Sequence, residues 1–167
     1  MADLKVHIVY IEGHCNIFNL HGGLHLFKTV TNEVEKCIAI SNRYIVQEIT
    51  DIIQSEMRLP LYVAEGTSEK KLAKIRSVPY LLHCYDKLSK SAGNIFIYGH
   101  SASENDEHIY KAIFSSKISK IYFCVYKPDN HLHEINGRLQ KYKAINNKKI
   151  IFVDSESAPV WNKKMIF

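Results

Sequence analysis

The segment best suited to binding chemistry is the polar run Gly99–His108, which directly follows the apolar run Ile95–Tyr98. Ligands of parallel sheets bind beyond the carboxyl ends of the strands, so this segment stands where a ligand is expected. Gly99 allows a sharp turn at the strand end, and the side chains and amides of His100 and Ser101 would then point into the crevice. There they could contact a ribose or a phosphate.

A structural interpretation explains part of the same segment. Ser103 can cap the helix that follows, and Asp106 stands three residues later, as in a capping box. A carboxylate in the first turn also suits the helix dipole. Helix capping explains why Ser103 and Asp106 are present but does not explain His100 and Ser101. The candidate cofactor-binding residues of this segment are Gly99, His100, Ser101 and also Asp106, which could serve either role.

A second candidate is His21, which follows a strand-like run and precedes the pair Gly22–Gly23. Histidine titrates near neutral pH and can act as a general base, so His21 is the candidate catalytic residue. With two glycines after it, the ring is expected to be accessible. The alternative is a turn histidine that hydrogen-bonds to the backbone. His25, between two leucines, is expected to be structural.

A third candidate is Glu65, which follows the strand-like run Leu61–Ala64 and could accept hydrogen bonds from sugar hydroxyls. Thr67 or Ser68 would cap the helix that begins there. The lysines that follow could meet a phosphate, but a solvated helix face explains them as well.

Three continuous apolar runs in the second half predict the elements that position the first segment: Ile95–Tyr98, Ile121–Tyr126 and Ile150–Val153. Strands without polar alternation are buried on both faces, so these runs predict neighbouring central strands of a parallel sheet. Apolar residues spaced by three or four predict the crossover helices Glu104–Ser115 and His131–Tyr142.

Helical spacing earlier in the chain predicts helices over Tyr44–Met57, over Ser68–Arg76 and from Pro79 onward. Strands are expected over Val6–Ile11, Asn16–Leu20 and Leu24–Thr29. Alternating strands and helices predict an α/β fold, with a mostly parallel sheet and helices on both faces. Because 167 residues suit one domain, we expect residues 1–167 to form a single domain.

Composition narrows the class of protein. The net charge of +5 comes from 22 Lys and Arg against 17 Asp and Glu spread along the chain, which does not indicate nucleic-acid binding. The first apolar run is too short for a signal peptide or a membrane span, so a cytoplasmic protein without membrane contact is expected. The four cysteines form no CxxC pair, and reduced, mostly buried thiols are expected.

Metal and nucleotide signatures are missing from the sequence. His131 and His133 are two residues apart on a predicted helix and do not share a face, so no metal site is expected. The chain also lacks GxGxxG, GxxxxGK[ST], GxSxG and HExxH, the usual signatures of dinucleotide, nucleoside-triphosphate, esterase and zinc-protease sites.

Three motifs, in their order along the chain, resemble those of a known protein family. They are Asn19-Leu20-His21-Gly22-Gly23-Leu24-His25-Leu26, the run Pro60–Lys71, and Gly99-His100-Ser101 with Asn105-Asp106-Glu107-His108-Ile109. The chain resembles the C-terminal half of the bacterial family numbered 4917 among domains of unknown function. More distantly it resembles sirtuin-like proteins of anti-phage defence and the abortive-infection family AbiH, which carries a GHS loop after a strand.

The sirtuin-like resemblance implies a Rossmann-like half domain and a function connected with NAD. In such enzymes a Leu-His-Gly element holds the catalytic histidine, which matches His21 with Gly22 beside it. A later Gly-x-Ser loop contacts the NAD ribose, which matches Gly99 to Ser101. The expected function is NAD binding or NAD glycohydrolysis in phage defence, with NAD as ligand or substrate.

Two alternatives accompany this expectation. The chain could be a non-catalytic nucleotide-sensing or protein-interaction module. It could also need a partner, because the glycine-rich segment that would cradle a pyrophosphate is absent. The partner would be a second chain that supplies the N-terminal half, or another copy of this chain.

Overall fold

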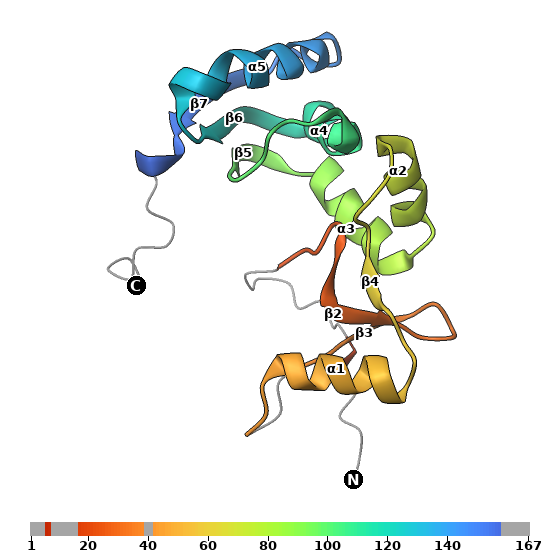
Figure 1. Cartoon of the computed structure of the whole chain (residues 1–167). Coiled ribbons are helices and arrows are strands. Elements are labelled where there is room, and N and C mark those ends of the chain that lie inside the picture. Colours follow the sequence, from red (N-terminus) through yellow and green to blue (C-terminus); the bar gives the residue numbers. More distant parts are fainter. Residues whose placement is uncertain (1–5, 8–16, 39–41, 158–167) are drawn as a thin grey trace. The chain divides into compact units, whose positions relative to one another are not determined.

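The computed structural model describes residues 6–7, 17–38 and 42–157. The chain is organised as two compact units, Met1–Asp86 and Lys87–Phe167, and each is described by itself (Figure 1).

The second unit is built on a parallel three-stranded sheet. Its strands are β5 (Ala92–Ile97), β6 (Lys117–Val125) and β7 (Lys149–Asp154), in the spatial order β5-β6-β7. Both pairings are parallel, so the prediction of three neighbouring parallel strands is confirmed. Within the described residues only β6 has a strand on each side, so β5 and β7 are edge strands and not the central strands expected.

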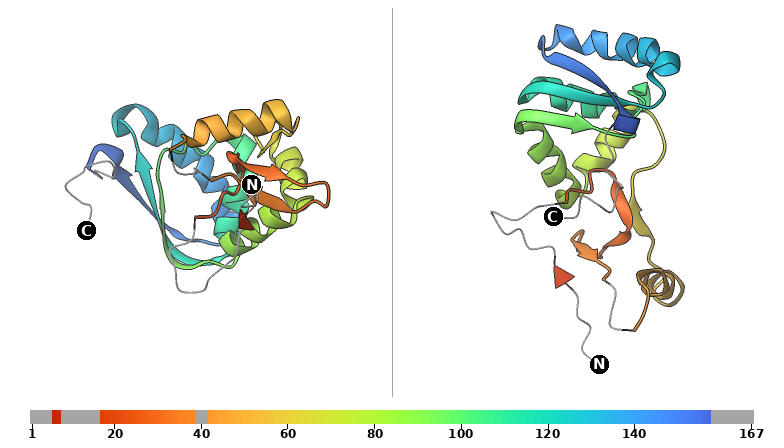
Figure 2. Two further views of the ribbon diagram at one scale, coloured as in Figure 1. Left: turned by 90° about the horizontal axis from the view of Figure 1, so that it is seen from below. Right: turned by 90° about the vertical axis from the view of Figure 1, so that its left-hand side faces the viewer.

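Two crossovers connect these strands. The first consists of the short 3-10 helix η1 (Glu104–Asp106) and α4 (Glu107–Ser115), and the second of α5 (Pro128–Gln140) and the 3-10 helix η2 (Lys141–Ala144). The apolar spacing therefore located both helices. Because both connections step in the same direction across the sheet, right-handed crossovers place α4 and α5 on the same face (Figure 2).

The core of this unit lies between that sheet face and the helices. Tyr110, Phe114, Phe123 and Leu139 are among its fully buried side chains. On the other face Phe96 is 70% exposed. Within the described residues of this unit, α4 and α5 therefore cover one face of the sheet, because a chain that steps one way along a sheet carries its crossover helices on one side.

The first unit contains a separate antiparallel sheet, which the sequence did not predict. Its strands are β1 (Val6–His7), β2 (Gly22–Lys28), β3 (Val34–Lys36) and β4 (Pro60–Tyr62), in the order β1-β3-β2-β4. All three pairings are antiparallel. The described part of the chain therefore has an α/β architecture with two sheets, one antiparallel and one parallel.

Two of the expected early strands differ from the structure. Within Asn16–Leu20, the described residues form a loop that ends in a turn at Leu20–His21, and Asn16 lies outside the described residues. Of Val6–Ile11, only Val6–His7 is described, as β1. The third expectation, Leu24–Thr29, is confirmed with shifted ends as β2.

Three helices complete the first unit and the passage to the second: α1 (Ile45–Ser55), α2 (Ser68–Arg76) and α3 (Pro79–Ser89). The sequence located all three. Thr67 caps α2 by accepting a hydrogen bond from the Lys70 amide at 3.4 Å. Residues of β2, β4, α2 and α3 form the core here, with Leu26, Ile75 and Leu81 fully buried.

Candidate functional site

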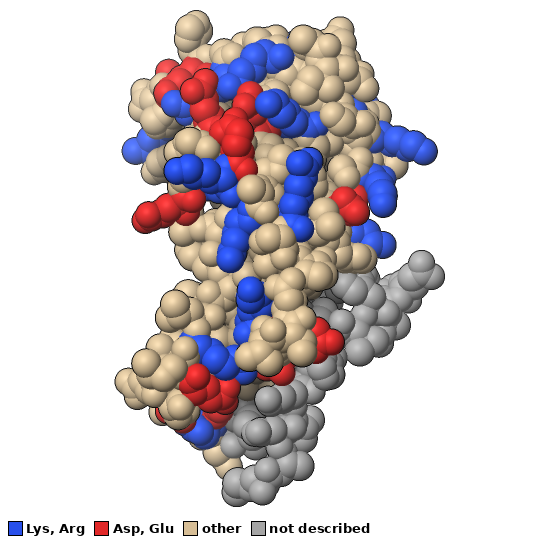
Figure 3. Space-filling view, turned by 90° about the vertical axis from the view of Figure 1, so that its right-hand side faces the viewer, with Lys and Arg blue, Asp and Glu red and all other residues tan. Residues whose placement is uncertain are grey.

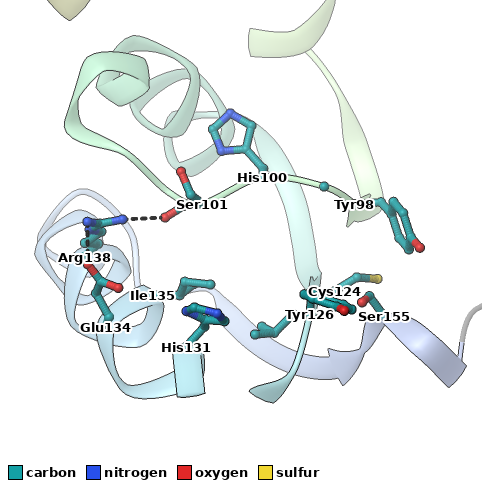
Figure 4. Close-up of a pocket in the computed structure, with 12 residues that line it drawn as sticks. Tyr98, His100, Ser101, Cys124, Tyr126, His131, Glu134, Ile135, Arg138 and Ser155 are labelled. Carbon is teal, nitrogen blue, oxygen red and sulfur yellow. Dashed lines mark hydrogen bonds and ion pairs between the residues drawn. The ribbon is translucent and has the colours of Figure 1, made fainter. Parts of the chain in front are cut away.

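A pocket of about 470 Å³ lies at the carboxyl ends of the parallel strands. Segments that end or follow all three strands line it together with one face of α5 (Figure 4). This is where ligands of such sheets bind, and the volume is in the range of small-molecule sites. The lining residues are Tyr98, Gly99, His100, Ser101, Cys124, Val125, Tyr126, His131, Glu134, Ile135, Arg138 and Ser155.

The loop after β5 has two left-handed backbone positions. Gly99 has φ 69°, and a Cβ at this position would meet no atom within 4 Å. Ala102 has φ 55° and is buried, which is a strained conformation for a residue with a Cβ. The sharp turn predicted at Gly99 is present, and the loop is held in an unusual conformation.

The His100 ring makes hydrogen bonds that stabilise this loop. Its Nδ1 accepts a hydrogen bond from the Ala102 amide at 3.2 Å and lies 2.6 Å from the Tyr110 hydroxyl. Because the amide can only donate, the ring proton of neutral His100 belongs on Nε2. Nε2 lies 3.5 Å from an Asp106 carboxylate oxygen. His100 therefore connects the loop to α4 while it also lines the pocket.

Tyr110 is the buried member of this group. Burial raises the pKa of its hydroxyl well above the usual value, and the nearby Asp106 carboxylate adds to the rise. The hydroxyl therefore stays protonated and donates to His100 Nδ1, which it shares as an acceptor with the Ala102 amide.

Arg138 connects α5 to the same loop across the pocket. Its Nη1 donates to the Ser101 carbonyl oxygen at 2.9 Å, and its Nη2 lies 2.6 Å from Glu134 Oε1 (Figure 4). Sequence reasoning missed both Glu134 and Arg138. The available signal was their spacing of four residues on a predicted helix, but that spacing is common on solvated helix faces.

The capping expectation is confirmed for Ser103 and wrong for Asp106. Ser103 Oγ accepts a hydrogen bond from the Asn105 amide at 3.4 Å, and Ser103 begins η1. Asp106 makes no side-chain cap for α4. Its carboxylate faces His100 instead, because the extra turn of 3-10 helix moves the start of α4 to Asp106 itself.

The remaining candidate residues belong to the first unit. His21 is half-buried in a turn, less accessible than expected, and its carbonyl oxygen accepts a hydrogen bond from the Val63 amide at 2.8 Å. Gly22 begins β2 with φ 77°, and a Cβ there would stand 2.0 Å from the Leu61 carbonyl oxygen. Glycine is thus required at position 22 by the close approach of two strands.

Glu65 is exposed in the turn between β4 and α2. The lysines that follow differ from the expectation of a solvated face, since Lys70 is exposed but Lys71 is buried. The structure therefore groups Gly99, His100, Ser101 and Asp106 in one unit and places His21, Gly22 and Glu65 in the other.

The structure also bears on the expectations for the cysteines, the surface charge and membrane-spanning helices. Cys37, Cys84 and Cys124 are buried free thiols, and Cys15 lies outside the described residues. On the face shown in Figure 3, Lys and Arg side chains are scattered, with groups of Asp and Glu side chains between them. Among the described helices, none has both the length and the apolar character that a bilayer crossing requires.

Fold and pocket together define a class: an α/β protein with a parallel-sheet unit and a ligand-sized pocket at the carboxyl edge of that sheet. The chain belongs to the family described as Domain of unknown function (DUF4917), whose model matches residues 7–161. No curated protein and no solved structure matches the chain.

Proposed function

We propose that the pocket in the unit Lys87–Phe167 binds a nucleotide and that NAD is the first candidate. The observation that carries the proposal is the convergence of all three strand ends and α5 on one pocket of about 470 Å³. The loop Gly99–Ser101, which resembles the ribose-binding loop of sirtuin-like proteins, is part of its lining. A relation to sirtuin-like defence proteins and to AbiH, and a role in phage defence, belong to the same proposal.

Aromatic side chains support a planar ligand. Tyr98 and Tyr126 line the pocket and are 46% and 57% exposed. The Lys127 ammonium lies over one face of the Tyr126 ring, 5.2 Å from its centroid, which leaves the opposite face for a planar ligand. Stacking of a base on an aromatic ring contributes about 1–3 kcal/mol. Gly99 adds open space beside the backbone, where a ligand can approach closely.

Isothermal titration calorimetry of the full chain with NAD tests the binding proposal. We expect Tyr126→Ala to weaken binding about tenfold or more, because a stacking surface is lost. Phe96→Ala is the matched control: this exposed aromatic lies on the same sheet but outside the pocket lining, so its loss should leave the affinity unchanged. Absence of NAD binding at millimolar concentration, or equal loss in both variants, would contradict the proposal.

The catalytic part of the proposal assigns His21 as general base in NAD hydrolysis. Water attacks the ribose C1′ as the bond to nicotinamide breaks, and nicotinamide leaves with the bonding electron pair. His21 accepts a proton from the attacking water, either directly or through a ribose hydroxyl that takes up the water proton in turn, and the products are ADP-ribose and nicotinamide.

His21→Ala tests this step separately from binding. We expect the variant to bind NAD as the unchanged chain does and to lose nicotinamide release, measured by chromatography. His25→Ala, a histidine on neighbouring β2, is the control and should keep its turnover per folded molecule. NAD binding without nicotinamide release by the unchanged chain would support the alternative, a non-catalytic nucleotide-sensing module.

A partner that completes the nucleotide site, either a second chain or another copy of this one, also stays a proposal. Light scattering with and without NAD measures the molar mass, and so the number of chains in the assembly. A mass that corresponds to one chain under both conditions would exclude the homo-oligomer.

A further inference from the structure

The charges in the pocket lining cancel. Among the described residues that line the pocket, Arg138 is the one Lys or Arg and Glu134 is the one Asp or Glu. They are paired with each other at 2.6 Å, and Arg138 also donates to the Ser101 carbonyl oxygen. A phosphate group in the pocket would meet a cation that is already engaged and a carboxylate that repels it.

Three backbone amides of the segment after β5 are also engaged. Amides at the start of a helix are a common phosphate site because they point outward without partners. Here the Ala102 amide donates to His100 Nδ1, and the Asn105 amide donates to Ser103 Oγ. The Asp106 amide donates to the Ser103 carbonyl oxygen at 3.0 Å. These three donors are therefore taken by protein atoms.

The start of α5 offers little more to an anion. Pro128 occupies the first turn and has no amide hydrogen, and the Asn130 amide donates to the Lys127 carbonyl oxygen at 3.0 Å. Asp129 adds a negative charge in the same turn. The ammonium group of Lys127, the residue before Pro128, is engaged over the Tyr126 ring. Both helix starts that follow the strands of this sheet are thus poor phosphate sites.

The pocket instead has two sides of different chemistry. Figure 4 shows Tyr98, Cys124 and Tyr126 on one side and Glu134 with Arg138 on the other. The first side offers aromatic and apolar surface to a planar base. The second offers carboxylate oxygens that accept hydrogen bonds from hydroxyl groups, as ribose recognition requires.

We infer that the pocket recognises the base and ribose of its ligand and leaves the phosphate groups in solvent. This inference rests on the proposed nucleotide binding and defines the part of the ligand that is bound. The ligand class is a nucleoside or the nucleoside end of a larger nucleotide. Affinity then comes from stacking and hydroxyl contacts, and added phosphates contribute little.

Calorimetry with two ligand series tests the inference: adenosine, AMP and ADP, and nicotinamide riboside with its mononucleotide, each at 50 and 300 mM NaCl. In the series that binds, we expect the dissociation constant to change less than about threefold with added phosphate or salt. A gain of about tenfold or more per phosphate that salt removes would overturn the inference but leave nucleotide binding intact. No binding of these ligands or of NAD would instead contradict the proposed function.

Glu134→Gln gives a second measurement. Removing this carboxylate leaves Arg138 without its ion-pair partner, so we expect the affinity for AMP relative to adenosine to rise about threefold or more. Glu104→Gln is the matched control, since Glu104 pairs with Lys141 at 3.2 Å outside the pocket lining. An unchanged ratio in Glu134→Gln, or the same rise in both variants, would overturn the inference.

Discussion

At the scale of single residues, His100 shows how one side chain serves both the loop and the core. Its ring nitrogens face the Ala102 amide, the Tyr110 hydroxyl and the Asp106 carboxylate. The ring therefore stabilises the left-handed position at Ala102, which would otherwise cost free energy. A ligand that enters the pocket meets a loop that is already in place.

Tyr110→Phe removes the hydroxyl from this group and should lower the free energy of unfolding by about 0.5–1.5 kcal/mol, the net value of one hydrogen bond. Urea unfolding followed by circular dichroism measures the change. Tyr62→Phe, at an exposed position in β4, is the control and should stay within about 0.5 kcal/mol of the unchanged chain. Equal effects of the two variants would mean that the hydroxyl of Tyr110 contributes no stability.

A second residue-scale prediction concerns the pH dependence of stability through His25. Partial burial lowers the pKa of its ring below 6.5, and the charge of Lys36 lowers it further. As pH falls through 6.5, the unfolded chain therefore binds a proton more readily than the folded chain, and stability decreases. We expect His25→Gln to lose less stability than the unchanged chain between pH 7.5 and pH 5.5.

Lys36→Gln tests the cause of that shift. It keeps His25 and removes the neighbouring charge, so its loss of stability between the two pH values should lie between those of His25→Gln and the unchanged chain. Urea unfolding at both pH values measures all three proteins. Identical pH profiles would show that His25 does not contribute.

At the scale of elements, Lys148 connects the end of α4, the start of β6 and the start of β7. Its ammonium group is buried and donates to the carbonyl oxygens of Ser116 and Ile118 at 2.7 and 2.6 Å. Burial lowers the pKa of this lysine. The lysine side chain therefore holds the carbonyl groups on either side of the step from α4 into β6.

Lys148→Met keeps the length of the side chain and removes its donors. We expect the free energy of unfolding to fall by about 1–3 kcal/mol, because two carbonyl groups would lose a buried charged donor. Lys149→Met changes the exposed next residue and should have an effect within about 0.5 kcal/mol. A Lys148→Met protein as stable as the Lys149→Met protein would show that the buried hydrogen bonds are not stabilising.

At the scale of the whole molecule, two hydrophobic cores divide the chain. Each consists of residues from its own unit, with Ile75 in one and Ile121 in the other. Segments with their own cores can open separately, whereas the sequence predicts one domain for residues 1–167. Whether the units unfold together is therefore a measurable property.

Ile121→Val and Ile75→Val form a matched pair for that measurement. Each deletes one buried methyl group and should cost about 0.5–1.5 kcal/mol. We expect hydrogen exchange to accelerate mainly in β5, β6 and β7 for Ile121→Val and mainly in β2, β4 and α2 for Ile75→Val. The same acceleration of both sets of amides by either variant would instead indicate one cooperative domain.

The sequence by itself determined the parallel sheet and the place of the pocket. Runs such as Ile121–Tyr126 have no polar alternation, so they indicated strands of a parallel sheet, and a polar loop after such a strand stands at the carboxyl edge. These are local properties of the chain. The starts of α2 and α3 were also located correctly, because Thr67 and Pro79 signal them through local sequence alone.

Only the tertiary structure decided how the polar residues are paired. Arg138 reaches the Ser101 carbonyl 37 residues away, and Asp106 faces His100 in place of the cap that its spacing suggested. Spacing along the chain describes one helix turn, whereas these contacts depend on where α4 and α5 pack on the sheet. The antiparallel sheet was missed for the same reason, since β2 finds its partners β3 and β4 only in the folded chain.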